Sequence, residues 1–254
     1  MQNAMDPDSE PFPNQNAENE NAPAQGQKAE DANKQQEIRE AALKLLSYIQ
    51  DMKTRGGKLA EIAKGYESIR KGENFADQVV VGEIPKQSKT PSNNAEVYIS
   101  EEGLIQIRID SSFILKRHNP AYIYAVLAEE WSHFRDLQEI ANKEGKPRSM
   151  NEEEHLESEI RAKLQALEAY KQCKEEGVGS SVRFLDELLG KIESVKKQRE
   201  EGKITEEEAR EKEIEIIIKH LQEMGYEVAK RYQEREMLKK FRKFLEEIRG
   251  KPRE

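Results

Sequence analysis

The segment Glu129-Glu130-Trp131-Ser132-His133 contains the residues best suited to chemistry. Glu129 and His133 are four positions apart, so on a helix their side chains lie one turn apart on the same side. Carboxylates and imidazoles both bind divalent metals such as zinc. Glu130 directly follows the first of these two ligands, where a carboxylate can take a proton from metal-bound water. The spacing therefore predicts a metal site that activates water.

Glu130 also has an unusual setting for a charged residue. A helix beginning at Pro120 would carry an apolar stripe along one face, with Glu130 near its centre and His133 at its edge. Burying an unpaired carboxylate is costly, so this glutamate should be protonated, bound to a metal or paired with a cation. A salt bridge to a neighbouring Arg or Lys is therefore the structural alternative to a functional role. The stripe consists of Ile123, Val126, Leu127, Phe134 and Leu137.

The stretch from Ala121 to Asp136 resembles the active-site helix of zincin-type metallopeptidases. In that family an apolar run is followed by His-Glu-x-x-His and often by an Asp three residues on. The resemblance covers roughly residues 78 to 170. It implies that Glu130 is the general base, that His133 is a metal ligand and that Asp136 supports a ligand. It also implies a peptide substrate, aligned by an edge strand of the sheet.

The first and third metal-ligand positions of the motif show how closely this chain matches the family. Glu129 occupies the place of the first histidine of the motif, so the resemblance implies a degenerate site. In many such families a downstream acidic helix supplies the third ligand, and here Glu159 matches best, with Glu157 as the competitor. The implied ligand set is therefore Glu129, His133 and Glu159.

A ligand set with one nitrogen and two anionic oxygens has chemical consequences. Two anionic ligands donate more charge to the metal, so bound water should be less acidic than in a site with two histidines. Oxygen ligands also shift the preference from zinc toward harder ions such as Mn²⁺, with iron as a further candidate. We therefore expect weak zinc binding and poor hydrolysis. The alternative is a pseudoenzyme that binds a peptide or protein segment in the cleft, with or without metal.

The elements that must position these residues follow from the hydrophobic pattern. Residues 35–177 are expected to form an α+β domain, predominantly helical, with a small antiparallel sheet. The hairpin of this sheet is predicted from two alternating apolar runs around a glycine-containing turn. The expected elements are two helices ending near Gly56 and Gly72, a strand over 79–81, the hairpin over 97–109, the motif helix over 120–142, and an acidic helix capped by Ser149 and Glu152.

The two ends of the chain differ from this domain. Residues 1–34 are rich in Asn, Gln, Pro, Ala and Glu, and we expect them to be disordered because they cannot bury enough apolar surface. Residues 178–254 show helical periodicity and are expected to form a helical hairpin or an arm. Apolar stripes over 214–224 and 237–248 are more often core than partner surface. If these stripes instead face a partner or a second copy of the chain, the protein would be an interaction protein or homo-oligomer without catalysis.

A di-metal carboxylate protein is a further alternative. Glu130 and His133 are three residues apart, and so are Glu152 and His155. Two such pairs, with one Glu from each of two further helices, occur in di-iron four-helix bundles. The two pairs here lie close together in the chain, astride a single turn, and a β-hairpin has no place in a plain bundle. Both features disfavour this interpretation.

Composition argues against several other classes. Of the 254 residues, 35% are hydrophobic and 36% are charged, and no apolar run is long enough to span a membrane. The net charge of -8 disfavours a general nucleic-acid binder. Cys173 is the only cysteine, which rules out an intramolecular disulfide. No apolar segment of the signal-peptide type is found at the N-terminus, so a cytoplasmic location is expected.

Overall fold

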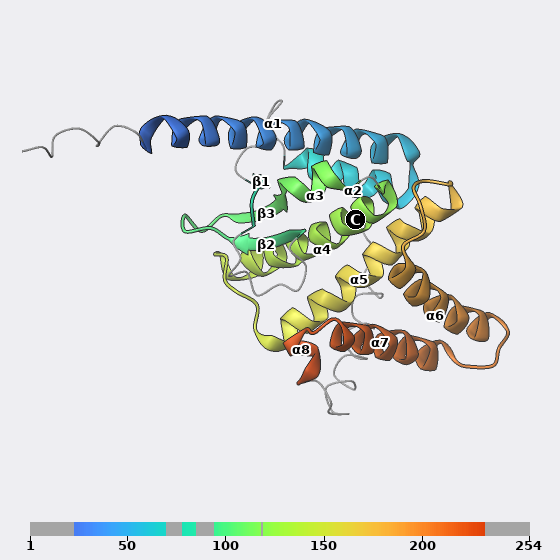
Figure 1. Cartoon of the computed structure of the whole chain (residues 1–254). Helices are drawn as coiled ribbons and strands as arrows, with labels where there is room; N and C mark the ends of the chain where they lie inside the picture. The colour runs from blue at the N-terminus through green and yellow to red at the C-terminus, as the bar shows by residue number, and fades with distance from the viewer. Residues whose placement is uncertain (1–22, 70–77, 85–93, 118, 232–254) are drawn as a thin grey trace, which may run out of the picture.

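The computed structural model describes residues 23–69, 78–84, 94–117 and 119–231, most of which are helical (Figure 1). Several helices pack against one small sheet at the side of the molecule, and this confirms the predominantly helical α+β class. The motif helix α4 (Pro120–Glu144) lies at the centre and is buried around most of its circumference between 121 and 134. The elements that contact it are helices α1 (Pro23–Arg55), α2 (Gly57–Ser68) and α5 (Glu152–Glu175) and strands β2 (Ala95–Ile99) and β3 (Ile105–Asp110).

Both ends of α4 lie close to where the sequence predicts them. Asn119 is the N-cap residue and Pro120 the first helical residue, where the missing N–H of proline is not needed. The Asn119 side chain bonds to the backbone of Ser180 rather than to its own helix, donating to the carbonyl at 2.8 Å and accepting from the N–H at 3.2 Å. Gly145 ends the helix with a φ of 75°, a conformation that favours glycine.

The sheet has three strands in the order β1-β3-β2, where β1 comprises Val79–Gly82. Strands β2 and β3 pair antiparallel, with Val97 opposite Ile107, which confirms the predicted hairpin. Strand β1 pairs parallel with β3, so the sheet is mixed and the expectation of an antiparallel sheet is wrong. The alternation of side chains predicts a strand but does not tell the direction of its neighbour. The strand order leaves β2 at an edge.

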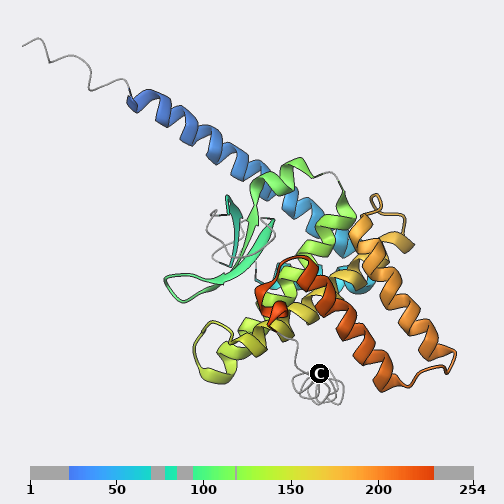
Figure 2. The same cartoon turned by 60° about the horizontal axis from the view of Figure 1, so that its bottom comes forward.

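Helix α1 already begins at Pro23, so the expectation of disorder is wrong for residues 23–34. Residues 1–22 lie outside the described part of the chain. Ala, Gln, Lys and Glu dominate the start of α1, and these residues are strong helix formers. Figures 1 and 2 show this part of the helix projecting beyond the rest of the molecule. Packing against the core begins at Ala41.

A short helix, α3 (Ser111–Lys116), follows β3 directly and was not predicted. Asp110 caps it by accepting a hydrogen bond from the backbone N–H of Phe113 at 2.9 Å. The helix is too short to show a hydrophobic period, which is why the sequence pattern missed it. It packs against α1, where Lys44 donates to the carbonyl of Leu115 at 3.2 Å.

Side-chain hydrogen bonds fix the connection between α4 and α5. Asn151 and Glu154 form the capping box of α5, each accepting from the other's backbone N–H at 2.9 Å. The expected box of Ser149 and Glu152 is therefore wrong, since Glu152 already lies in the first turn. Arg148 donates to the carboxylate of Glu154 and also to a glutamate at the end of α4. This arginine thus joins the end of one site helix to the start of the other.

Glu154→Gln is expected to lower the free energy of unfolding by about 1 kcal/mol near neutral pH, because the ion pair it removes is partly exposed. The hydrogen bonds from Arg148 lower the pKa of Glu154 from 4.5 to about 2 in the folded protein. A carboxyl whose pKa is lowered on folding stabilises the fold at pH values above its pKa in the unfolded protein. This stabilisation is lost as the pH falls toward its pKa in the folded protein. Gln can still serve in the capping box. Urea unfolding should therefore show a difference that shrinks as the pH falls from about 4.5 to about 2. A difference independent of pH would contradict this.

The chain after α5 forms a helical hairpin of α6 (Arg183–Glu200) and α7 (Glu206–Glu223), followed by α8 (Glu227–Lys230). The hairpin folds back onto α5. The apolar stripe over 237–248 lies outside the described residues. The stripe over 214–224 is mainly core, because its buried members are Ile214, Ile217, Ile218 and Leu221.

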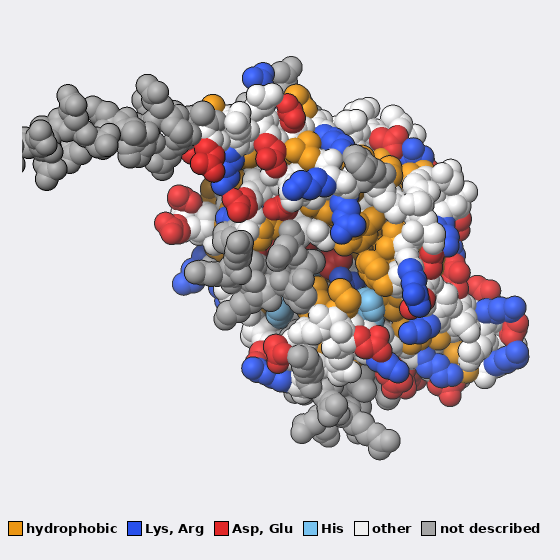
Figure 3. Space-filling model, in the orientation of Figure 1, with side chains coloured by type: hydrophobic (Ala, Val, Ile, Leu, Met, Phe, Trp, Pro, Cys, Tyr) orange, Lys and Arg blue, Asp and Glu red, His pale blue; other side chains and the backbone are white. Residues whose placement is uncertain are grey.

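Charged side chains of both signs are distributed over the surface. On the face shown in Figure 3, Lys and Arg side chains alternate with Asp and Glu around the rim, and apolar side chains gather near the centre. The described residues of this face therefore form no continuous basic surface of the kind that binds nucleic acid. Within the described ranges, no helix has the length and apolar character needed to cross a membrane.

Candidate metal centre

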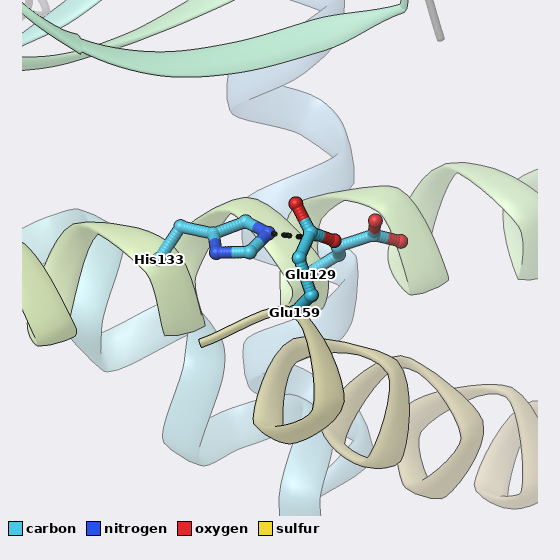
Figure 4. Close-up of side chains that lie close together, drawn as sticks. All are labelled: Glu129, His133 and Glu159. Atoms are coloured by element: carbon cyan, nitrogen blue, oxygen red, sulfur yellow. Dashed lines mark ion pairs between the residues drawn. The ribbon is translucent and has the colours of Figure 1, made fainter. Parts of the chain in front are cut away.

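Glu129 and His133 on α4 and Glu159 on α5 bring their ligand atoms within 4.8 Å of one another (Figure 4). The spacing of four residues places Glu129 and His133 on the same side of α4. Their side chains are 14% and 15% exposed, and that of Glu159 is 6% exposed, so the cluster lies below the surface. The structure thus assembles the three residues of the expected ligand set.

Hydrogen bonds to the backbone hold the motif turn of α4 in place. Tyr66 on α2 donates from its hydroxyl to the carbonyl of Leu127 at 2.9 Å, and Gln165 on α5 donates from Nε2 to the carbonyl of Ala128 at 3.0 Å. Both donors are buried. They bind the two carbonyls immediately before Glu129 and so fix this turn between α2 and α5.

His133 is oriented by a second residue of α5. Its Nδ1 lies 2.7 Å from the hydroxyl oxygen of Ser158, which is fully buried. When Nδ1 carries the proton and donates to that hydroxyl, Nε2 presents its lone pair to the cluster, as metal-binding histidines do. The resemblance assigned the supporting role to Asp136, whereas in the structure Ser158 makes this bond.

Only one of the two oxygens of Glu159 has a hydrogen-bond partner among the described residues. Its Oε1 lies 3.2 Å from His155 Nε2, whereas the buried Oε2 has no hydrogen-bond partner among the described residues. Burial raises the pKa of Glu159, but His133 and His155 outweigh it, so the pKa is lowered overall and the carboxylate is charged. A buried charged oxygen that accepts no hydrogen bond is costly. A cation bound between Glu159 and His133 would remove this cost.

Glu130 is only 5% exposed and borders the same cavity as the cluster. Burial, followed by the charges of Glu129 and Glu159, raises its pKa well above the ordinary value. Lys163 partly opposes this effect, but its ammonium bonds to Glu129. Among the described residues Glu130 forms no ion pair, so the salt-bridge alternative has no support. Burial and these neighbouring charges therefore favour the protonated form of its carboxyl in the protein without metal.

A cavity of about 270 Å³ opens onto the cluster. All the residues of strand β2 line this cavity, and so do His155 and Tyr226. Because β2 is an edge strand of the described sheet, its outer backbone groups can pair with an added strand. The cavity therefore combines polar ligand groups with a surface that suits an extended chain.

Lys163 and Tyr226 of the site were not predicted from the sequence, and His155 was named only in the di-metal alternative. Lys163 bonds through its ammonium to Glu129 and lies 5.7 Å from the ring centre of Tyr226. His155 contacts Glu159, although the imidazole itself is half exposed. Lys163 and His155 each stand four residues from Glu159 on α5, and this spacing is a signal that could have identified them. Tyr226 follows the turn after α7 and has no local signal in the sequence.

The remaining expected residues lie beside the cluster rather than in it. Asp136 and Glu157 both face Arg161, at 3.2 Å and 3.8 Å. Burial raises the pKa of Glu157 to about 7 despite the opposing charge of Arg161. The third position of the cluster thus belongs to Glu159. Glu152 is exposed and bonds to an arginine that follows α8, so only His155 of the second pair in the di-metal alternative approaches the cluster.

Comparisons of the chain with protein-family models, with curated proteins and with solved structures found no match. The site itself offers one imidazole nitrogen and two carboxylate groups to a cation, with a buried acid beside them. Such a donor set accepts zinc and also harder divalent ions such as Mn²⁺ and Fe²⁺.

Proposed function

We propose that Glu129, His133 and Glu159 bind a divalent metal ion, and that the chain is a zincin-like metallopeptidase of low activity. The observation that carries this proposal is Glu159 Oε2, a buried oxygen that has no hydrogen-bond partner among the described residues and lies 3.8 Å from His133 Nε2. A metal ion bound to both atoms would satisfy the oxygen. Ser158 and His155 contact the outer sides of the two ligands, as outer partners of metal ligands do.

Glu130 is assigned the role of general base in this proposal. A bound metal ion would supply Lewis acidity, lowering the pKa of a water molecule and polarising a peptide carbonyl. Glu130 lines the same cavity as the three ligands. Its pKa is raised by burial and by its acidic neighbours, which brings the carboxyl closer to the range in which a group both takes up and releases protons near neutral pH.

Strand β2 supports a peptide or an extended protein segment as the substrate. All five of its residues, Ala95–Ile99, line the cavity that holds the cluster. A segment that pairs with this edge would gain backbone hydrogen bonds without any requirement on its sequence. The same pairing would place its peptide groups alongside Glu130 and the three ligands.

Two features of the site account for the low activity that we propose. Two anionic ligands leave bound water less acidic than two histidines would. Lys163 also engages Glu129 through an ion pair. These two observations favour a second function as well, in which the protein binds metal and an extended segment without cleaving it.

Glu130→Gln is expected to leave metal binding intact and to reduce peptide hydrolysis by about 100-fold, because an amide of the same shape cannot accept the proton. Metal content can be measured by mass spectrometry after incubation with Zn²⁺ or Mn²⁺, and hydrolysis with a library of quenched fluorescent peptides. Equal cleavage by both proteins would contradict the role of Glu130. Absence of bound metal would contradict the site, whereas bound metal without cleavage by the natural protein would favour the second function.

A further inference from the structure

Lys163 places a buried positive charge inside the candidate metal centre. It stands on α5 one turn after Glu159, and its ammonium bonds to Oε1 of Glu129. The side chains of this pair are 13% and 14% exposed, so water screens their interaction little. The ring of Tyr226 lies 5.7 Å from the ammonium and adds a favourable cation–π contact. Although burial opposes it, Glu129 and the other acidic neighbours hold the pKa of Lys163 above its ordinary value.

The ion pair engages a group that the metal would need. Glu129 Oε1 accepts from Lys163, and in Figure 4 the Glu129 carboxylate points away from the His133 ring, with the carboxylate of Glu159 between them. His133 and Glu159 instead lie with their ligand atoms 3.8 Å apart. Two of the three ligands are thus directed toward each other, whereas the third is held by a resident cation.

We propose that Lys163 is the counterion that a divalent metal must displace from Glu129, and that it thereby sets the metal affinity of the site. This inference rests on the proposed metal centre and names the residue that regulates its occupancy. Glu129 and Glu159 carry two negative charges, and Lys163 already balances one of them. A metal ion bound while the ammonium stays nearby leaves an excess of positive charge in a poorly screened environment. The affinity is therefore lower than the three ligands alone would give.

The same argument predicts which cations the site admits. Na⁺ or K⁺ carries the same charge as the ammonium that it would replace. Its binding would also cost the hydrogen bond that Lys163 donates to Glu129. A divalent ion gains more from the two carboxylates and also from the imidazole of His133. Lys163 should therefore make the site selective for divalent over monovalent cations.

Lys163→Met is expected to bind Mn²⁺ and Zn²⁺ about tenfold more tightly than the natural protein, because the competing charge is gone while the long apolar side chain is kept. Isothermal titration with each metal salt alone measures the affinity. Lys171→Met is the matched control, since this lysine lies on the same helix, is 43% exposed and pairs with Glu193 at the surface. Its metal affinity should equal that of the natural protein. Lys163→Arg keeps the charge and should also leave the affinity low.

Loss of Lys163 leaves Glu129 without its cation, so the metal-free variant is expected to melt at a lower temperature than the natural protein. Saturating Mn²⁺ should restore most of that loss. Lys163→Gln can still donate to Glu129 without a charge, and it carries the same affinity prediction should Lys163→Met fail to fold.

The outcomes of this titration separate the inference from the proposed function. Tighter binding by the uncharged variants, or binding by them alone, supports the displacement of Lys163. If the natural protein binds metal as tightly as both uncharged variants, or more tightly, the role of Lys163 is overturned and the metal centre still stands. No binding by any of the proteins overturns the metal centre and this inference together.

Discussion

Replacing His133 with alanine is expected to weaken the binding of Zn²⁺ and Mn²⁺ by more than about 100-fold, since even the loss of an outer partner of a metal ligand costs about 10- to 100-fold. His133 provides the only nitrogen of the cluster. Without it the two remaining ligands are carboxylates, and Lys163 already balances part of their charge. Isothermal titration of the folded variant measures the effect.

His220 offers a matched control for this substitution. It lies on α7, stacks against the ring of Phe184 with the ring centres 6.2 Å apart, and does not belong to the cluster. His220→Ala should therefore remove an imidazole close to the site and leave the metal affinity unchanged. Equal weakening by both substitutions would show that the helices were disturbed rather than a ligand removed. Undiminished binding by His133→Ala would contradict its role as a ligand.

Gly65→Ala is expected to lower the free energy of unfolding by about 2–3 kcal/mol, the cost of forcing atoms into a packed core. Alanine is normally the better residue inside a helix, by about 1 kcal/mol. At Gly65 on α2, however, a Cβ atom would lie 2.2 Å from Cε2 of Trp131. The indole stacks on Phe134 and lies against Tyr66, so it has little room to move. Helices α2 and α4 would have to separate at the motif itself.

Gly190→Ala is the control for Gly65→Ala. Gly190 lies inside α6, is exposed, and a Cβ atom there would meet no other atom within 4 Å. This substitution should raise the free energy of unfolding by about 0.5–1 kcal/mol. Urea unfolding of the two variants should thus give effects of opposite sign. Stabilisation by Gly65→Ala as well would contradict the tight contact between α2 and α4.

Local features of the candidate site could be predicted from the sequence because they depend on short spacings. Glu129 and His133 share a face through their separation of four residues, and the apolar stripe around Glu130 predicts its burial, which the structure confirms. The third ligand position on α5 came from the resemblance alone. Its assembly with the first two depends on the packing of α4 against α5, and no local pattern contains that packing.

The parts that could not be predicted depend on contacts between distant segments or on weak local signals. The parallel pairing of β1 with β3 is decided by the path of the chain between strands, not by the side chains of either strand. Tyr226 reaches the cluster only because α6 and α7 fold back onto α5. Lys163 differs from both, since its spacing from Glu159 was visible in the sequence. It was missed because a lysine in a charged helix usually faces water.

The most direct test of the metal centre is diffraction from crystals grown with Zn²⁺, with data collected at the zinc absorption edge. We predict an anomalous peak about 2.0–2.2 Å from His133 Nε2 and from a carboxylate oxygen of each of Glu129 and Glu159. Lys163 should then have left Glu129. A cluster without such a peak, with the Lys163 ammonium still bound to Glu129, would contradict the proposed metal centre.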